Sequence, residues 1–197
     1  MITYSDITKY NDLTFEEYLK LGKDFYSHSF LKRERNGIVE PLKITDNIRI
    51  GSLVDSIITE PEKADLKSDL YPFAKDISDK IKSEFSGLIF YFKKQLSYTG
   101  IATYESFKMP VVGRLDFLLE NQAVIDLKVT KSKNIPELIN FMGYKNQLWH
   151  YAKLSGVKKA YLLVHSIPNK RTEVHYVDVS SDYNDFWADK IIDFGKV

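Results

Sequence analysis

Hydrophobic residues recur every three to four positions near the start of the chain, a spacing that predicts helix. Thr14 and Glu17 form a capping-box pattern, so a helix is expected to begin there. We expect it to continue, with a break near Ser27, to a turn at residues 36–37, where Asn precedes Gly.

Two further helices are predicted before residue 90. One covers residues 47–60, with its apolar positions on one face, and the other starts near Pro72, because proline is tolerated in a first helical turn. Residues 86–95 fit either a helix or a strand, and we favour a helix.

After residue 100 the apolar pattern changes to that of strands. Short strands are expected at residues 101–108, 111–120 and 123–130. The connections between them are tight, and strands joined in this way are antiparallel.

The last part of the sequence alternates between the two patterns. A helix is predicted from Pro136 to a stop at Gly156, followed by an apolar strand at 160–167 that lies parallel in the same sheet after this crossover. An alternating edge strand at 173–180 and a closing helix at 182–194 complete the chain.

This order predicts an α/β fold, with a central mixed β-sheet flanked by helices. The 197 residues suffice for one ordinary domain, so we predict a single domain over residues 1–197. Within it, residues 1–95 are expected to be mainly helical and residues 100–180 to carry the sheet.

The composition of the chain excludes several kinds of functional site. The net charge is +1, so a nucleic-acid site would have to be local. Cysteine is absent, which excludes disulfides, thiolate zinc sites and cysteine-ligated iron–sulfur clusters but allows a metal bound by oxygen. No signal peptide or membrane-spanning stretch is evident, so we expect a cytoplasmic protein without a membrane partner.

A predicted hairpin centred on Asn121 carries four charges within apolar strands. Its register would place Asp116 opposite Asp126, and Arg114 opposite Lys128. Like charges in cross-strand positions repel each other, and buried charges are costly unless they are paired or bind a metal.

Two interpretations fit these charges. The first is an internal salt-bridge cluster, with Asp116 paired to Arg114 and Asp126 to Lys128. The second is a divalent cation, such as Mg²⁺, bound by Asp116 and Asp126, with Lys128 beside a metal-bound water. A metal, an activated water and an ammonium group suit phosphodiester hydrolysis.

Four motifs in order resemble the PD-(D/E)xK nuclease superfamily, in its RecB-like and phage-type (exonuclease VIII-like) branch. They are GRLD at 113–116, DLK at 126–128, QLWHY from Gln147 to Tyr151, and IGSLVDSIITEP at 50–61. The resemblance implies a restriction-endonuclease-like core and a Mg²⁺-dependent deoxyribonuclease, with Mn²⁺ able to substitute.

The resemblance also implies roles for individual residues. Asp55, Asp116, Asp126 and the backbone carbonyl of Leu127 would bind the metal, and Lys128 would position or activate the attacking water. Asp55 occupies the place where these relatives carry histidine, and aspartate is a competent magnesium ligand. On the residue pattern alone, Asp55 could equally be a solvated position on an amphipathic helix.

Gln147 and Tyr151 lie one helical turn apart, so spacing alone allows simple packing. The resemblance implies instead that they are catalytic residues, which orient the lysine or a DNA phosphate. Residues proposed to contact DNA share a positive charge or a hydroxyl group, although a short basic run is often only a solvated face. They are Arg114, Thr130, Lys131, Ser132 and Lys133, with Lys32, Arg33 and Arg35 in the first helical region.

Four other residues have weaker signals. Glu105 is either an alternative acidic ligand for the metal or a residue of the protein surface. Gly113 is expected to permit a close approach of backbone or substrate. His150 and His165 lack the spacing of metal ligands, so we expect both to be structural.

The predicted function is a phage-type or recombination-associated exonuclease that hydrolyses DNA. A structure-specific or restriction-like endonuclease of the same fold remains open, as does a catalytically silent DNA-binding or assembly module. The expected partners are DNA and, beyond it, a second copy of the chain or a recombination protein.

Overall fold

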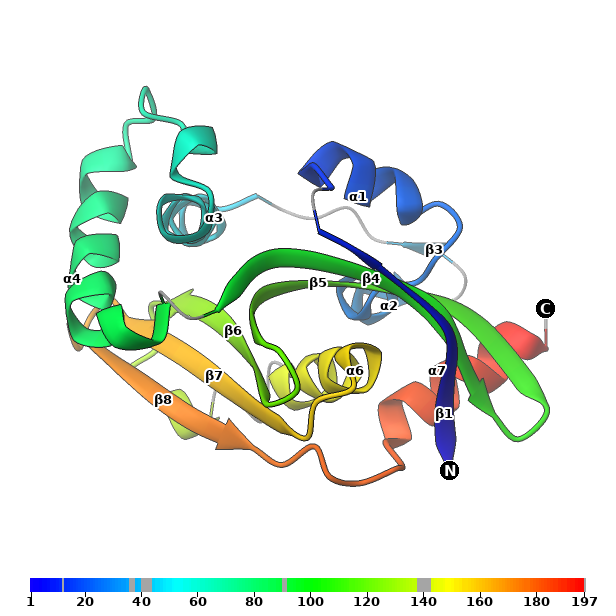
Figure 1. Cartoon of the computed structure of the whole chain (residues 1–197). Helices are drawn as coiled ribbons and strands as arrows, with labels where there is room; N and C mark the ends of the chain where they lie inside the picture. Colours follow the sequence, from blue (N-terminus) through cyan, green and yellow to red (C-terminus); the bar gives the residue numbers. More distant parts are fainter. Residues whose placement is uncertain (12, 36–37, 40–43, 90–91, 138–142, 197) are drawn as a thin grey trace.

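The fold is built on a six-stranded mixed sheet with helices on both faces (Figure 1). The computed structural model describes residues 1–11, 13–35, 38–39, 44–89, 92–137 and 143–196. The sheet strands are β1 (Ile2–Tyr10), β4 (Lys93–Tyr104), β5 (Phe107–Leu119), β6 (Ala123–Thr130), β7 (Lys159–Ser166) and β8 (Arg171–Val177). A separate two-stranded ribbon consists of β2 (Glu34–Arg35) and β3 (Ile38–Val39).

The strand order in the sheet is β1-β4-β5-β6-β7-β8. All neighbours are antiparallel except β6 and β7, which are parallel. A parallel pair needs a crossover, and the helical segment between these two strands supplies it. The predicted α/β class with a mixed sheet, the parallel strand and the β8 edge strand are therefore confirmed.

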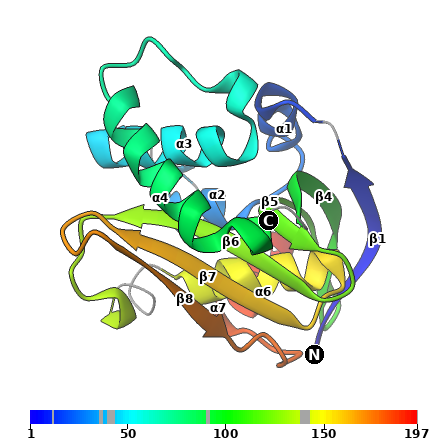
Figure 2. The ribbon, with the colours of Figure 1, turned by 60° about the vertical axis from the view of Figure 1, so that its left-hand side comes forward.

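Helices enclose the sheet from both sides (Figure 2). One face packs against α3 (Asp46–Thr59) and α4 (Tyr71–Ile89), and the other against α6 (Tyr144–Ser155) and α7 (Asp185–Gly195). Shorter helices are α1 (Phe15–Leu21), α2 (His28–Arg33) and the 3₁₀ turn η1 (Pro61–Lys63). No helix among the described residues has both the length and the hydropathy to cross a membrane.

Successive residues of β6 serve the two layers in turn, as the alternation of a strand requires. Ile125 and Leu127 belong to the core under α3 and α4, whereas Val124 belongs to the core under α6 and α7. Helices cover both faces of the sheet at β6, which explains why most residues of this strand are apolar on both of its sides.

The predicted capping box and helix break are confirmed, but the predicted helix extends too far, because α2 ends at Arg33 and residues 34–35 form strand β2. The Thr14 hydroxyl accepts a hydrogen bond from the Glu17 amide at 3.2 Å, and the Glu17 carboxylate accepts one from the Thr14 amide at 2.8 Å. The helical region breaks before His28, and the Ser27 hydroxyl accepts from the Phe30 amide at the start of α2. The predicted turn at 36–37 lies outside the described residues.

The expectation that residues 1–95 are mainly helical is wrong at the N-terminus, because β1 forms an edge of the sheet. Its pairing with β4 is irregular between Ser5 and Thr8, and Asp6 has a left-handed φ of 51°. This irregularity breaks the period-two pattern, and the strand is largely polar, so the sequence gives no strand signal there.

Two predicted elements differ at their boundaries. The segment 101–108 is not one strand, because a tight turn at Glu105 (φ 56°) joins β4 to β5. Residues 86–95 contain both structures: α4 reaches Ile89 and β4 begins at Lys93.

The predicted helix from Pro136 is divided. Residues 135–137 are helical, residues 138–142 lie outside the described part, and α6 begins after Gly143, whose φ is 69°. A left-handed glycine lets the chain change direction before the helix starts.

Gly113 permits a close approach, as predicted, and the partner is helix α6. A Cβ at this position would lie 2.9 Å from a methyl carbon of Leu154 and 3.1 Å from two ring carbons of Tyr151. A larger residue would therefore push α6 away from β5.

Both histidines singled out in the sequence have structural surroundings. His165 is buried, and its Nδ1 lies 3.0 Å from the Thr172 hydroxyl. His150 is fully buried: its Nε2 donates to the Val112 carbonyl at 3.1 Å, so its Nδ1 accepts from the Tyr4 hydroxyl at 2.8 Å. The His150 ring also stacks on Trp187, with centroids 4.1 Å apart.

These surroundings predict acid destabilisation. Burial lowers the pKa of His150 to about 3 in the folded protein, whereas the unfolded-state pKa of a histidine is about 6.5. Between these two pH values the imidazole is protonated in the unfolded chain and neutral in the folded one, so lowering the pH favours unfolding. The free energy of unfolding should fall by about 1 kcal/mol per pH unit between pH 6 and 4 through this group. Urea unfolding of His150→Gln should show a correspondingly shallower pH slope, and an unchanged slope would contradict this role.

Candidate active site

The predicted register of the second hairpin is confirmed next to the turn, but the predicted pairs Asp116–Asp126 and Arg114–Lys128 do not form, because the ladder ends before them. Phe117 pairs with Ile125 and Leu118 with Val124, which centres the turn on Asn121, as expected. The β5–β6 pairing runs only from Leu119 to Phe117, so the two strands separate at the next position, Asp116.

The β4 side of Asp116 is also distorted. The β4–β5 register passes from the Lys94–Phe117 pair to the Leu96–Leu115 pair, leaving Gln95 and Asp116 out of the ladder. Gln95 has a left-handed φ of 51°, which is uncommon for a residue other than glycine. Asp116 therefore lies where pairing with β6 ends and where pairing with β4 is interrupted at a single position.

The Asp116 side chain occupies part of the opening between β5 and β6. Its Oδ2 accepts a hydrogen bond from the Leu127 amide at 2.8 Å. Leu127 lies beyond the last β5–β6 pair, so this carboxylate replaces a missing ladder bond and satisfies a buried backbone donor.

A cavity of about 520 Å³ lies at this opening, between α3, over residues 47–55, and the second half of β6. Asp55, Asp116 and Lys128 line it, together with Tyr144. Gly51 also lines it, one turn before Asp55, and a Cβ there would meet no protein atom within 4 Å. Because Gly51 has no side chain, the space that a side chain would fill here belongs to the cavity.

Asp55 and Asp116 hold their negative charges at a cost. Burial, opposed by Lys128 and reinforced by the charge of Asp126, raises the pKa of Asp55 to about 6. Burial and the charges of Asp55 and Asp126 also raise the pKa of Asp116 well above its ordinary value. The structure thus brings the three predicted carboxylates within electrostatic reach of one another.

Lys128 partly neutralises this cluster. Its ammonium forms an ion pair with Asp126, which is 1% exposed, and donates to the Leu127 carbonyl at 3.3 Å. Burial alone would lower the pKa of Lys128, but Asp126 and Asp116 outweigh it and raise that pKa above its ordinary value. Lys128 is therefore a cation at neutral pH and has no lone pair with which to accept a proton.

Arg114 is arranged differently from the predicted salt-bridge cluster. It is buried and forms an ion pair with Glu60 at 3.1 Å rather than with Asp116. Its other groups donate to the Leu13 carbonyl at 3.0 Å and to the Gln95 side chain at 2.6 Å. These contacts give Arg114 a structural role, and a DNA phosphate could reach it only if the network opened.

Gln147 and Tyr151 form a hydrogen-bonded pair on the buried face of α6. The Gln147 amide donates to the Tyr151 hydroxyl at 2.8 Å. Burial, followed by the charges of Tyr18, Asp126 and Asp116, raises the pKa of Tyr151. The pair therefore lies near the carboxylate cluster.

The predicted DNA-contact residues lie at different distances from the cavity. Thr130 and Lys131 line it, whereas Lys133 is exposed on the following loop. Burial and then the charge of Lys128 lower the pKa of Lys32, which places Lys32 near the same cavity. Ser132 bonds within its own loop, Arg33 bonds the Ser29 carbonyl on α2, and the Arg35 side chain lies outside the described part.

Glu105, the reserve acidic ligand, is exposed in the β4–β5 turn and lines no part of this cavity. Two residues that contact the cluster have no signal in the sequence: Gln95, which bonds the Asp55 carboxylate, and Tyr144, whose ring centroid lies 5.5 Å from the Lys128 ammonium. Thr59 and Glu60 join the same network indirectly, through Gln95 and Arg114. Glutamine and threonine have no motif of their own, so the sequence holds no signal for this network.

The donor set fits a hard divalent cation, although no preformed cage is present. Among the described residues, no three His, Cys, Asp or Glu side chains are close enough to form a ready metal site. Asp126 Oδ2 is buried without a well-oriented hydrogen bond, and Asp55 and Asp116 are held close to like charge. Magnesium suits such oxygens, because it keeps several waters and needs few protein ligands.

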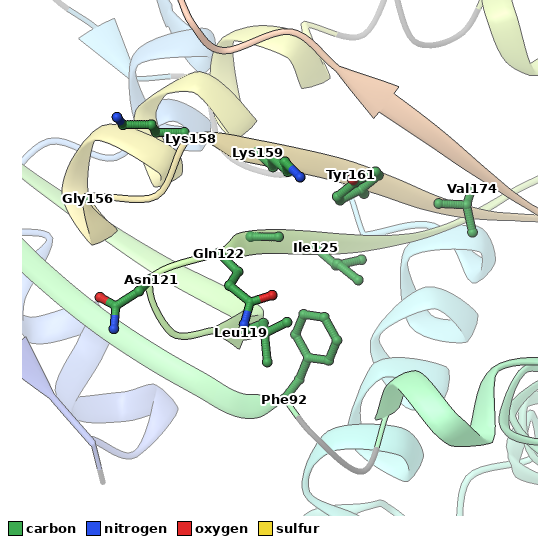
Figure 3. A pocket seen from close by; sticks show the side chains of 11 residues that line it. Phe92, Leu119, Asn121, Gln122, Ile125, Gly156, Lys158, Lys159, Tyr161 and Val174 are labelled. Atoms are coloured by element: carbon green, nitrogen blue, oxygen red, sulfur yellow. The ribbon is translucent and has the colours of Figure 1, made fainter.

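A second cavity, of about 650 Å³, lies at the opposite end of β6 (Figure 3). Its floor is apolar, with Phe92, Ile125 and Tyr161, and Lys158 and Lys159 lie at its rim. None of its described lining residues is acidic or a histidine, so the chemistry of metal binding points to the first cavity alone.

No protein-family model matches this sequence, and no curated protein sequence matches it. Solved structures do resemble it. A protein of Eubacterium rectale named "putative exonuclease" superposes with a TM-score of 0.59 at 18% identity, over 94% of this chain and 83% of its own. The protein SSO0001 matches with a TM-score of 0.45 at 17% identity, over 94% of this chain and 86% of its own.

At this level of identity the first similarity establishes the fold alone, and the second is too low to support an argument. The similarity to the Eubacterium rectale protein nevertheless extends along almost the whole chain. The arrangement of helices around a mixed sheet is thus one that a solved protein shares.

Proposed function

We propose that this protein is a divalent-metal-dependent nuclease that hydrolyses DNA phosphodiester bonds, most consistent with an exonuclease. One observation carries the proposal: three carboxylates and a protonated lysine converge at an opening in the sheet, where Asp55, Asp116 and Lys128 line a cavity. The sequence motifs and the name given to a similarly folded protein support it at the level of the fold.

Each residue has a task in this proposal. Asp55, Asp116 and Asp126, with the Leu127 carbonyl, would hold Mg²⁺ or Mn²⁺. When bound, such an ion supplies Lewis-acid stabilisation and lowers the pKa of a coordinated water. Because Lys128 is already protonated, it would orient the attacking water and stabilise negative charge on the phosphate rather than remove a proton.

The surrounding residues would hold this arrangement and the substrate. The Gln147–Tyr151 pair would support the part of the sheet that carries Asp116 and Asp126. Lys131 and Thr130 line the cavity, and Lys32 lies near it, so these groups would contact the DNA backbone. The space left by Gly51 would admit the substrate strand.

Metal-dependent digestion of DNA tests the activity itself. Purified protein should release nucleotides from linear DNA with Mg²⁺ or Mn²⁺ and should stop with EDTA, because the carboxylates need a cation to act on a phosphate. Covalently closed circular DNA should survive, since an exonuclease needs an end. Cleavage of the closed circle would favour the endonuclease alternative, and intact DNA under every metal condition would overturn the proposal.

The role of Lys128 gives a second prediction. Lys128→Ala should lower turnover by roughly a hundredfold or more, because it removes a positive charge from the transition state. Its affinity for Mn²⁺ should not decrease, since no metal ligand is lost. As a matched control, Lys75→Ala removes a positive charge from the exposed surface of α4 and should leave turnover within about twofold. Full activity in Lys128→Ala would remove this lysine from the mechanism.

Protein stability separates a metal site from a structural salt-bridge cluster. Asp116→Asn keeps an oxygen for the Leu127 amide and relieves repulsion from Asp55 and Asp126, so in EDTA it should melt no lower than wild type. With Mg²⁺ at about one hundred times its dissociation constant, wild type should gain about 2.7 kcal/mol and become the more stable protein.

The exposed variant Asp189→Asn on α7 serves as the charge control and should follow wild type in both buffers. Thermal melts with and without Mg²⁺ measure the crossover. If Mg²⁺ leaves the wild-type melting temperature unchanged, the metal site fails and the Asp126–Lys128 ion pair is a structural one.

A further inference from the structure

Gln95 is a buried polar residue at an unusual backbone position. Its φ is 51°, it lies outside the β4–β5 ladder, and it is 8% exposed. A left-handed conformation inside a strand changes the direction in which the side chain projects. Here the side chain reaches the C-terminal half of α3, which carries Asp55.

The Gln95 amide binds the Asp55 carboxylate at both oxygens. Its Nε2 lies 3.3 Å from Oδ1 and 3.1 Å from Oδ2, and it also donates to the Thr59 hydroxyl at 3.1 Å. In the part of the chain that the structure describes, Gln95 is the one side chain with a hydrogen bond to this carboxylate.

Arg114 fixes which end of the amide faces Asp55. A guanidinium only donates hydrogen bonds, so its Nε, 2.6 Å away, must meet the Gln95 oxygen. The NH₂ group is then turned toward Asp55. Glu60 and the Leu13 carbonyl hold Arg114 in turn, so the orientation is set by groups from three segments of the chain.

We propose that Gln95 is a positioning residue that holds the Asp55 carboxylate in the orientation needed to bind the divalent cation. This inference rests on the proposed function, since it assigns a support to one ligand of that site. Gln95 would not touch the metal or the substrate. Groups that bond to a metal ligand fix its rotamer, and losing one typically weakens metal affinity 10- to 100-fold.

The direct test is Mn²⁺ binding, measured from the electron paramagnetic resonance signal of free Mn²⁺. Gln95→Met keeps the length of the side chain but cannot donate to Asp55, so its dissociation constant should rise about tenfold. DNA digestion by this variant should need a correspondingly higher Mn²⁺ concentration but recover at saturation, because only the occupancy of the site has changed. In Gln95→Asn the shorter amide cannot reach Asp55, so the Mn²⁺ dissociation constant should rise by a similar factor. This variant replaces Gln95→Met in the experiment if Gln95→Met does not fold.

Two comparisons distinguish positioning from a general loss of stability. Gln122→Met makes the same substitution at an exposed position of the β5–β6 turn, outside this network, so its Mn²⁺ affinity should stay within about twofold of wild type. In a double-mutant cycle, Gln95→Met should weaken Mn²⁺ binding no further once Asp55 is changed to Asn, because Gln95 acts through that carboxylate.

The outcomes separate the two proposals. If wild type binds Mn²⁺ and folded Gln95 variants bind it equally well, Gln95 is only structural and this inference fails. It also fails if Gln95→Met weakens Mn²⁺ binding as much in Asp55→Asn as it does in wild type. If wild type itself does not bind Mn²⁺, the metal site of the proposed function fails, and the role of Gln95 fails with it.

Discussion

Repulsion between buried carboxylates at an opening in the sheet is the constraint around which this structure is arranged. Asp116 lies where β5 loses regular pairing with both neighbouring strands, and Asp55 and Asp126 add like charge nearby. A fold retains such a cluster only if other groups compensate for it, because unpaired buried charge is costly. Lys128 supplies one positive charge, and the Leu127 amide supplies a hydrogen bond to Asp116. The pKa values of Asp55 and Asp116 nevertheless remain raised, so these groups offset the repulsion only in part, and a divalent cation bound there would offset it further.

The rest of the fold brings these groups together from distant parts of the chain. Packing of α3 on the sheet carries Asp55 to the opening, while Gln95 and Arg114 tie that helix to β4 and β5. On the other face, Gly113 allows α6 to approach closely enough for Tyr151 to lie near the carboxylates. The geometry of the site therefore depends on both helical layers, and a shift of either layer would change the shape of the cavity.

Much of this could be predicted from the sequence, where local patterns decide the outcome. The apolar hairpin with its turn at Asn121 predicts the register of β5 and β6 next to the turn, and the capping box locates α1. The sequence does not predict that the ladder ends before Asp116. Strand β1 was missed because the irregularity at Asp6 interrupts its alternation. The predicted ion pair between Arg114 and Asp116 is also wrong: it considers only neighbours along one strand, whereas the actual partner, Glu60, comes from the end of α3. Contacts of this kind depend on how layers pack, and no local pattern encodes them.

The most direct test of the account is to locate the metal. Crystals grown or soaked with Mn²⁺ should show an anomalous-scattering peak in the cavity lined by Asp55, Asp116 and Lys128, within coordination distance of the Asp116 and Asp126 carboxylates. The same data should show Lys128 displaced from, or sharing, its contact with Asp126. A cavity without such a peak at saturating Mn²⁺, with the Asp126–Lys128 ion pair unchanged, would contradict the central claim and leave the cluster as a structural feature of the fold.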